Sequence, residues 1–219
     1  MSSSKLKVIA MISMLIDHIA AVLGPMSINY VVMRCIGRIA MPLFCYMIAE
    51  GCRHTRNPWK YFGRLAAFAL ISQLPFSYAF GVRTPNVYVN LAFAVLAVTC
   101  IELFKSKRIP IFFGLLVALI LAIFAEHIGA DYGFVVVPLI VLLYFTQNKR
   151  MQIIVIGFGA IILNIGSGFA PYVLSGTGAC VFVGLYNGKL GNLPRWFSYW
   201  FYPVHLIVLG YVFGQATFF

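Results

Sequence analysis

The chain has 219 residues, of which 62% are hydrophobic and 10% are charged, and its mean hydropathy is +0.95. Ordinary soluble domains carry about 25% charged residues, and a soluble globule of this size has too little interior for so much apolar side chain. The composition therefore excludes a water-soluble fold and predicts an all-α, polytopic transmembrane helical bundle.

The formal net charge of +11 does not indicate a nucleic-acid partner. A nucleic-acid-binding protein gathers Lys and Arg into a stripe on a polar domain, whereas here they occupy short gaps between apolar runs. Such gaps are typical of the cytoplasmic loops of membrane proteins. We therefore expect the lipid bilayer, and no nucleic acid, as a partner.

Apolar stretches long enough to cross a bilayer recur along the whole chain. A spanning helix needs about 20 mainly apolar residues, within a range of about 17–25. Loop signals separate nine such stretches: 7–24, 29–51, 60–80, 88–104, 110–127, 131–146, 151–166, 170–186 and 196–216. The sixth and seventh are short, which leaves a tilted or re-entrant arrangement open. We expect residues 1–219 to form a single transmembrane domain.

Basic residues fall in alternate gaps between these stretches, and such residues stay on the cytoplasmic side. One side has only Arg83, together with the acidic Glu126 and Asp131. The other side has Lys5, Lys7, Arg53, Arg56, Lys60, Lys105, Lys107, Arg108, Lys149, Arg150, Lys189 and Arg195. The amino terminus is therefore expected in the cytoplasm, the carboxyl terminus outside it, and the protein in the bacterial inner membrane.

Ionisable side chains lie inside three of the predicted helices, where Asp, Lys or Arg at the centre costs about 2.5–3.5 kcal/mol. At about 1.5 Å per residue, His18 lies about 15 Å from the inner edge, near the midplane of a core about 30 Å thick, and Asp17 is beside it. The same arithmetic gives matching depths for Arg38 and His205, with Arg34 one turn from Arg38. Three helices thus bring ionisable groups to one level.

Two interpretations of this group remain open. In the structural interpretation, Asp17 pairs with Arg34 or Arg38 and this ion pair merely locks the first two helices together. A lone histidine is also more often structural than catalytic. A neutral imidazole can instead take a proton from a nucleophile near pH 7, and an arginine can stabilise an oxyanion. We predict a catalytic group of His18, Asp17, Arg38 and His205, without deciding which histidine is the base.

A second polar cluster lies at the inner ends of the second and third predicted helices. Its members include Glu50 and His54. Positive-inside topology accounts for part of the cluster. The forked guanidinium group of Arg and the ammonium group of Lys also bind phosphates, however. Trp59 and Tyr61 suit either an interfacial aromatic belt or stacking on adenine. The functional interpretation is a binding site for a phosphorylated donor formed by Arg53, Thr55, Arg56, Lys60, Tyr61 and Arg64.

No metal is expected, because the spacing of Glu126, His127 and Asp131 matches no recognised metal site.

Two strings near the start of the chain resemble the hallmark of the TraX family: LKVIAMISMLIDHIAAVL and IGRIAMPLFCYMIAEGCRHTRNPWKYFGRLAAFALISQLPFSYAF. Three later strings resemble it too: ADYGFVVVPLIVLLYF, LYNGKLG and YWFYPVHLIVLG. The resemblance covers nearly the whole chain and is weakest over 86–125. Matching positions are Asp17, His18, Gly37, Arg38, Pro42, Phe44, Glu50, Gly51, Thr55, Arg56, Tyr61, Arg64, Pro75, Asp131, Tyr132, Asn187, Gly188, Tyr202, Pro203 and His205.

The resemblance implies a membrane acetylase of conjugative pilin, which transfers an acetyl group from acetyl-CoA to the amino terminus of the mature pilin subunit. The family is similar to wider groups of transmembrane acyltransferases that use an intramembrane histidine, which favours His18 by analogy. The acceptor is open, since another peptide amine or an envelope glycan fits as well. Two other functions also remain: a transporter or channel that uses the Asp/Arg/His group, and a non-catalytic partner in pilus assembly.

Overall fold

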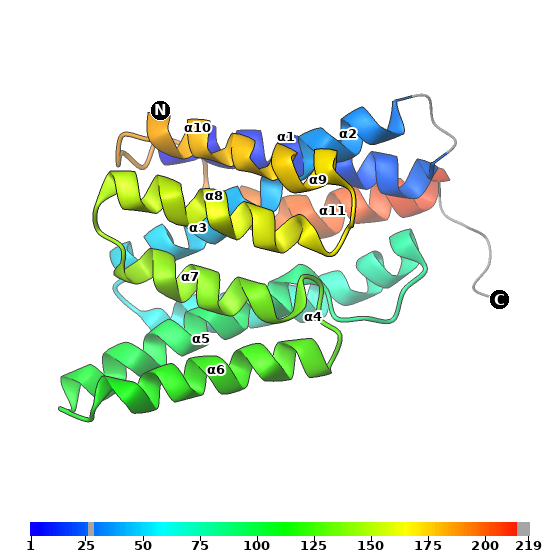
Figure 1. The fold of residues 1–219 in the computed structure, drawn as a ribbon. Coiled ribbons are helices and arrows are strands. Elements are labelled where there is room, and N and C mark those ends of the chain that lie inside the picture. The colour runs from blue at the N-terminus through cyan, green and yellow to red at the C-terminus, as the bar shows by residue number, and fades with distance from the viewer. Residues whose placement is uncertain (26–28, 214–219) are drawn as a thin grey trace.

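The computed structural model describes residues 1–25 and 29–213, with the side chain of Arg195 left out. Within these residues every regular element is helical (Figure 1). The α-helices are α1 Ser3–Leu23, α2 Tyr30–Gly37, α3 Ala40–His54, α4 Pro58–Phe80, α5 Val87–Ser106, α6 Ile111–His127, α7 Val136–Phe145, α8 Lys149–Ile165, α9 Ala170–Ser175, α10 Ala179–Leu185 and α11 Arg195–Phe213. The short 3₁₀ turns are η1 Gly133–Val135 and η2 Gly176–Gly178.

The described helices lie at the nine predicted positions when each interrupted stretch is taken as one. The interrupted stretches are α2 with α3, η1 with α7, and α9 with η2 and α10. Positions 214–216, at the end of the last predicted stretch, lie outside the described residues. The prediction of an all-α bundle of about nine helices is therefore confirmed.

Several of these helices have the length and composition of membrane spans. Within the described chain, Ser3–Leu23, Tyr30–His54 and Val87–Ser106 are long and apolar enough to cross a membrane. Shorter apolar helices follow at Ile111–His127, Gly133–Phe145 and Ala170–Leu185. The protein is a multi-pass membrane protein.

The second predicted stretch is not one continuous helix, because it is interrupted at Arg38 and Ile39. Pro42 explains the interruption. Proline has no backbone N–H, so the helical hydrogen bond from residue 42 to the carbonyl of Arg38 cannot form. The chain ends α2 at Gly37 and starts α3 at Ala40, which leaves Pro42 in the first turn, where its missing donor costs least.

The longer helices run side by side, and their connections gather at the two ends of the bundle (Figure 1). Helix α5 packs against α4, α6 and α7, while α11 packs against α4 and α1. The buried residues of α6 are all small: Gly114, Ala118, Ala122 and Ala125. Small residues allow close helix approach in lipid, where association depends on van der Waals packing. Helix α6 is therefore held at the edge of the bundle by close contact with α5.

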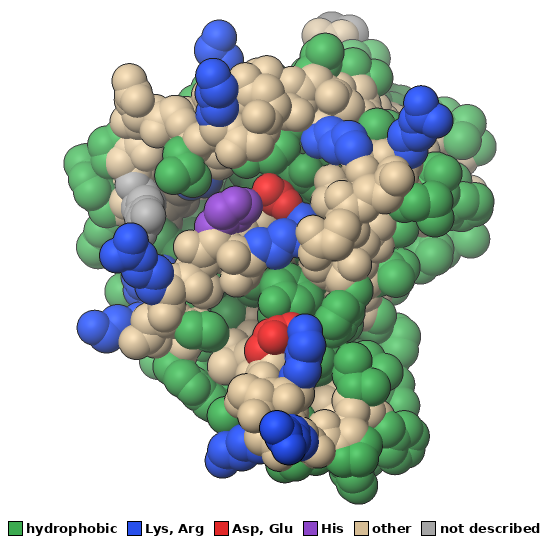
Figure 2. All heavy atoms as spheres, turned by 90° about the vertical axis from the view of Figure 1, so that its left-hand side faces the viewer, with side chains coloured by type: hydrophobic (Ala, Val, Ile, Leu, Met, Phe, Trp, Pro, Cys, Tyr) green, Lys and Arg blue, Asp and Glu red, His purple; other side chains and the backbone are tan. Residues whose placement is uncertain are grey.

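One end of the bundle, here called the basic face, joins the start of α1 to the turns α3–α4, α5–α6, α7–α8 and α10–α11. The N–H of Ser3 donates to the Lys189 carbonyl at 2.7 Å, which ties α1 to the α10–α11 loop. Figure 2 shows this face, where Lys and Arg side chains surround a hollow with acidic and histidine side chains in it. The basic gaps that the sequence assigned to one side thus lie together.

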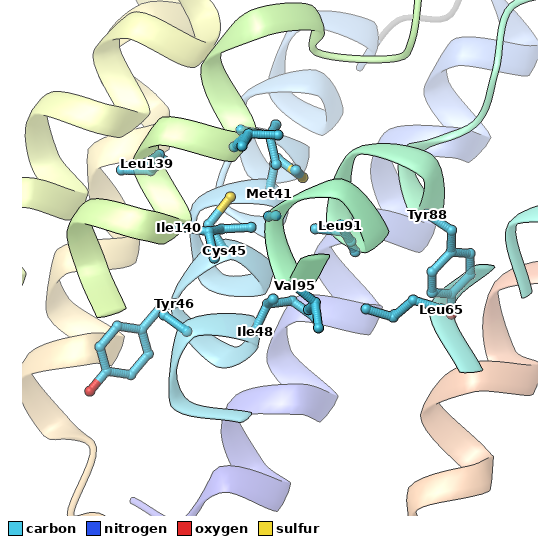
Figure 3. Close-up of a cluster of buried hydrophobic side chains, with 14 of the residues drawn as sticks. Met41, Cys45, Tyr46, Ile48, Leu65, Tyr88, Leu91, Val95, Leu139 and Ile140 are labelled. Carbon is cyan, nitrogen blue, oxygen red and sulfur yellow. The ribbon is translucent and has the colours of Figure 1, made fainter. Parts of the chain in front are cut away.

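The centre of the bundle is a cluster of buried apolar side chains between α3, α5 and α7 (Figure 3). Leu43, Cys45 and Ile140 have no exposed surface, and Val95 is 1% exposed. This core holds α3 in place between α5 and α7. The polar ends of α3 therefore have fixed positions, one toward α1 and the other on the basic face.

Candidate active site

The first part of the site is an ion-pair cluster formed by Asp17 on α1 and Arg34 and Arg38 at the end of α2. Asp17 Oδ2 accepts from Arg34 Nη1 at 2.8 Å, and Asp17 Oδ1 accepts from Arg38 Nη2 at 2.8 Å. Asp17 is 7% exposed. The carboxylate therefore binds both arginines, where the sequence left a choice between them. Because a buried charge without a partner is costly, this cluster locks α1 to α2.

Gly37 makes room for the ion-pair cluster. A Cβ atom built at this position would overlap the side chain of Asp17. Only a residue without a side chain lets the carboxylate sit between the two guanidinium groups, so the glycine is a steric requirement of the ion pair.

The second part of the site is a histidine pair, His18 on α1 and His205 on α11. His18 Nδ1 and His205 Nε2 are 2.8 Å apart, which is a hydrogen-bond distance. Successive helix residues point about 100° apart, so Asp17 faces α2 while His18 faces α11. The structure therefore brings together the four residues predicted as a catalytic group, in two adjoining contacts.

Aromatic side chains enclose the histidine pair. The edges of Phe80 and Tyr202 meet the His18 ring, with ring centroids 5.0 and 6.1 Å away. Phe201 stacks on the other ring, that of His205, at 5.0 Å. Aromatic rings on α4 and α11 therefore hold the two imidazoles in place and restrict the approach of water.

The loop between α6 and α7 closes the site from another side. Asn90 on α5 donates a hydrogen bond to the carbonyl of Asp131, and the N–H of Asp131 donates to the Pro85 carbonyl at 3.1 Å. Asp131 lies close enough to Arg38 for its carboxylate and the guanidinium to interact electrostatically. The sequence indicates only an outer loop for Asp131, and the proximity of its carboxylate to Arg38 depends on loop geometry that no spacing rule gives.

The predicted donor cluster lies at the α3–α4 turn on the basic face. Arg56, Lys60 and Arg64 are exposed, and the Arg64 guanidinium lies 5.5 Å from the centroid of the buried Tyr61 ring. The hydroxyl of Thr55 donates to the carbonyl of Asn57 at 3.3 Å. Three exposed cationic groups are therefore available to an anion at the basic face, and an aromatic ring lies against one of them.

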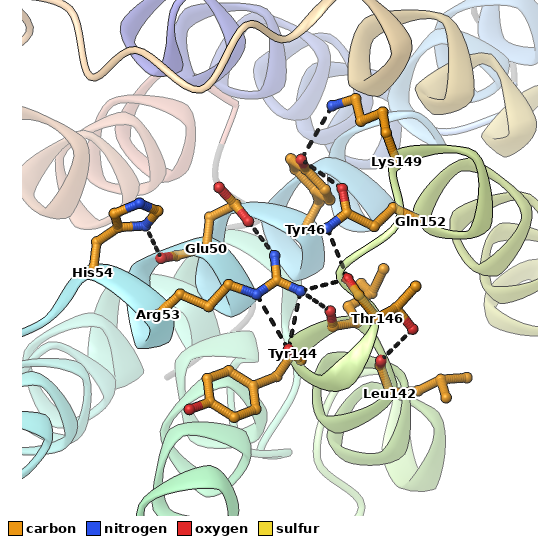
Figure 4. A network of polar contacts seen from close by, with 10 residues as sticks. Tyr46, Glu50, Arg53, His54, Leu142, Tyr144, Thr146, Lys149 and Gln152 are labelled. Atoms are coloured by element: carbon orange, nitrogen blue, oxygen red, sulfur yellow. Dashed lines mark hydrogen bonds and ion pairs between the residues drawn. The ribbon is translucent and has the colours of Figure 1, made fainter.

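Arg53 lies apart from the rest of that cluster, with its guanidinium already bound (Figure 4). It pairs with Glu50 and donates to the carbonyls of Leu143, Tyr144 and Thr146 at the end of α7. A guanidinium has five N–H donors, and most of them are used here. Arg53 thus serves chiefly to cap α7 and to join it to α3.

Arg53 also forms part of the wall of a pocket on the basic face, with a volume of about 690 Å³. Lys149 Nζ lies against two neighbouring aromatic rings of this pocket, 5.2 Å from the Tyr46 centroid and 5.1 Å from that of Tyr186. In the sequence, Lys149 is a sign of topology only, as one of the basic loop residues. The helical spacing of Tyr46, Glu50 and Arg53 (i, i+4, i+7) was the available sign that they share one face of α3.

Among residues 1–25 and 29–213, no group of three or more His, Cys, Asp or Glu side chains is arranged to hold a metal ion. Glu126 accepts a hydrogen bond from the N–H of Phe134 at 2.7 Å and so supports the turn η1.

Comparisons with known proteins give a consistent result. A family model described as "TraX protein" matches residues 2–213. The chain is similar to "Probable fimbrial assembly protein FimC, serogroup H1" of Dichelobacter nodosus, with 32% identity over 235 residues that cover 95% of this chain and 94% of that protein. It is also similar to "Uncharacterized protein RP591" of Rickettsia prowazekii (strain Madrid E), with 28% identity over 164 residues, 73% of this chain and 62% of that one. No solved structure matches it.

Proposed function

Because this chain belongs to the TraX family, we propose that it is an integral membrane acetyltransferase, a single domain over residues 1–219. The acetyl group moves from cytosolic acetyl-CoA to an amine at the membrane, most simply the N-terminal amine of a pilin-like peptide. The name of the Dichelobacter relative, a probable fimbrial assembly protein, supports an acceptor from a pilus or fimbria. We place the protein in the bacterial inner membrane with the basic face in the cytoplasm, in accord with the positive-inside rule.

The observation that carries the proposal is the hydrogen-bonded histidine pair beside the ion-pair cluster. Acetyl transfer to an amine needs a base, since the attacking nitrogen must lose a proton. Imidazole is the side chain best matched to that task near neutral pH. Arg38 supplies positive charge near the histidines, where an oxyanion develops on the thioester carbonyl.

The reaction is balanced without another reactant. The amine nitrogen attacks the thioester carbon, a C–N bond forms and the C–S bond breaks. The proton of the amine passes to a histidine of the pair and then to the CoA thiolate, which leaves as the thiol. The products are an acetamide and free CoA.

The donor binds at the basic face in this proposal. Arg56, Lys60 and Arg64 are exposed there and present cationic groups to the phosphates of CoA. Thr55 and Tyr61 belong to the same turn, and Tyr61 supports Arg64 from below. Arg53 contributes by fixing the end of α3, because its own donors are bound to Glu50 and α7.

The test is acetyl transfer by the purified full-length chain in lipid nanodiscs. Isotope-labelled acetyl-CoA is mixed with a synthetic peptide carrying a pilin-type amino terminus, and mass spectrometry detects a gain of one acetyl group. His18→Ala should abolish transfer while the protein stays folded in the membrane. His127→Ala, which changes an exposed histidine at the end of α6, is the matched control and should keep full activity. Undiminished transfer by His18→Ala would remove His18 from the mechanism.

Two further variants in the same assay examine the donor site. Arg56→Ala and Arg64→Ala should each raise KM for acetyl-CoA and leave kcat nearly unchanged, because they remove ground-state contacts to the donor. If neither variant alters KM, the cationic residues of this turn serve membrane topology alone.

A second candidate function is a non-catalytic partner in pilus assembly, which the name of the Dichelobacter relative favours. The same variants separate the two functions. An assembly partner would leave the peptide unmodified in the wild type, yet it would still co-purify with pilus components. A transporter or channel would instead produce ion or solute flux in proteoliposomes.

A further inference from the structure

The two histidines of the pair are not equivalent, because His205 has a second hydrogen-bond partner. His205 Nδ1 lies 2.7 Å from the carbonyl oxygen of Phe201, one turn earlier on α11. A carbonyl oxygen only accepts hydrogen bonds, so His205 must carry its proton on Nδ1. A neutral imidazole has one N–H, which leaves Nε2 of His205 with a lone pair.

That lone pair faces His18 Nδ1 at 2.8 Å, so the proton between the rings belongs to His18. The ring planes differ by 17° and the centroids are 5.0 Å apart. This separation exceeds the distance between the nitrogens by about two ring radii. The rings therefore meet end to end, close to a straight N–H···N bond. In the neutral pair, His18 has its proton on Nδ1 and a free lone pair on Nε2.

We infer that His205 is a positioning residue, which fixes the tautomer and orientation of His18 so that His18 Nε2 is the base. The inference rests on the proposed function, which left open which histidine takes the proton. Both nitrogens of His205 are engaged, one by Phe201 and one by His18. Only His18 therefore offers a free nitrogen to an incoming amine.

The surroundings hold this arrangement against rotation of either ring. A half-turn of the His205 ring would place carbon atoms against the Phe201 carbonyl and His18, and both hydrogen bonds would be lost. The stacked Phe201 ring and the edge of Tyr202 restrict the movement of His205. Because the Phe201 carbonyl accepts from His205 Nδ1, His205 Nε2 must accept from His18 Nδ1, and the tautomer of His18 is fixed in turn.

The first test reads the tautomer directly and needs no enzymatic activity. The full chain, which has four histidines, is labelled with ¹⁵N-histidine, placed in lipid nanodiscs and studied by NMR near neutral pH. His54→Gln and His127→Gln assign the two other histidines. We expect protonated Nδ1 and bare Nε2 on His18, protonated Nδ1 on His205, and a scalar coupling between the facing nitrogens. A proton on His18 Nε2 in the wild type would overturn the inference.

Two variants separate positioning from a general structural role. In His205→Gln the side-chain oxygen reaches the place of the former Nε2 and can accept from His18. In His205→Asn the amide can still bond to the Phe201 carbonyl but is too short to reach His18. We expect His205→Gln to keep the His18 tautomer and His205→Asn to lose it. An unchanged His18 spectrum in His205→Asn would contradict the positioning role.

The kinetic consequence is measured in the acetyl-transfer assay. His205→Asn should lower kcat by about 10²-fold, the lower end of what general acid–base catalysis contributes, with KM for acetyl-CoA unchanged. His205→Gln should recover most of the loss, and equal losses in the two variants would overturn the positioning role. A wild type that shows the expected NMR signals but transfers no acetyl group would refute the proposed function and leave the tautomer assignment standing.

Discussion

At the scale of single residues, the ion-pair cluster depends on the absence of a side chain at Gly37. The Asp17 carboxylate occupies the space that a side chain at position 37 would need, and from there it binds Arg34 and Arg38. The three charges are mostly withdrawn from solvent, with side-chain exposures between 11% and 21%. Each charge therefore depends on its partners.

We predict that Gly37→Ala destabilises the protein by about 3 kcal/mol, because the added methyl group displaces Asp17 and leaves buried charges unpaired. The measurement is reversible unfolding in mixed micelles, followed by circular dichroism. The matched control is Gly63→Ala on α4, where a Cβ atom meets nothing within 4 Å and the better helix propensity should raise stability by about 0.5–1 kcal/mol. Equal effects at the two positions would show that Gly37 is not a steric requirement.

Depth along the helices was enough to predict that His18, Asp17, Arg38 and His205 meet, because their distances along each helix follow from a fixed rise per residue. The partners within the group could not be predicted. Whether Asp17 takes one arginine or two depends on side-chain rotamers and on the space at position 37. The binding of Arg53 to α7 could not be predicted either, since no sequence rule says which helix end lies beside α3.

At the scale of elements, Pro203 inside α11 leaves one carbonyl of that helix without its helical partner, and a side chain of α5 binds this carbonyl. Proline has no N–H, so the carbonyl of Tyr199, four residues earlier, loses its helical hydrogen bond. The hydroxyl of Tyr88 donates to this carbonyl at 3.2 Å. This hydrogen bond joins α11 to α5 between one and two helical turns before His205.

We predict that Tyr88→Phe lowers stability by about 1 kcal/mol, because it removes this hydrogen bond and leaves the partly buried Tyr199 carbonyl unpaired. For a chain of this size the expected fall in Tm is about 2–4 °C. Thermal unfolding in detergent measures it. Tyr211→Phe, at a side chain that is 87% exposed, is the control and should leave Tm unchanged. A Tm equal to that of the wild type would mean that the Tyr199 carbonyl has another partner.

Helix positions followed from apolar length, but their interruptions did not. Proline is common in membrane helices that continue past it, so Pro42 alone could not predict the break between α2 and α3. The stretch 131–146 becomes a 3₁₀ turn and a short helix because Tyr132 and Gly133 adopt positive φ angles of 66° and 48°. Left-handed backbone of this kind ends regular helix, and Tyr132 gave no sign of it in the sequence.

At the scale of the whole molecule, the alternation of basic gaps predicted two unlike faces, and the basic face gathers the expected loops. Which face meets the cytoplasm remains a prediction. It follows from the charge bias of Lys and Arg rather than from packing, and packing alone would permit either orientation.

Single-cysteine labelling of intact cells tests the orientation, in a background where the five native cysteines are replaced. Arg83→Cys in the α4–α5 loop should react with a membrane-impermeant maleimide added outside spheroplasts. Lys107→Cys in the α5–α6 loop should react only after permeabilisation. Both positions are exposed, so accessibility to water is matched. The reverse pattern would invert the topology and place the proposed donor site outside the cytoplasm.

The enclosure of the histidine pair between α1, α4 and α11 has an energetic consequence for the proposed cycle. The proton that leaves the amine returns to the departing sulfur within the same turnover, and the imidazoles end as they began. Summed over one turnover, no net charge crosses the bilayer. Such a cycle draws nothing from the transmembrane electrochemical gradient, and it would proceed equally well in a de-energised cell envelope.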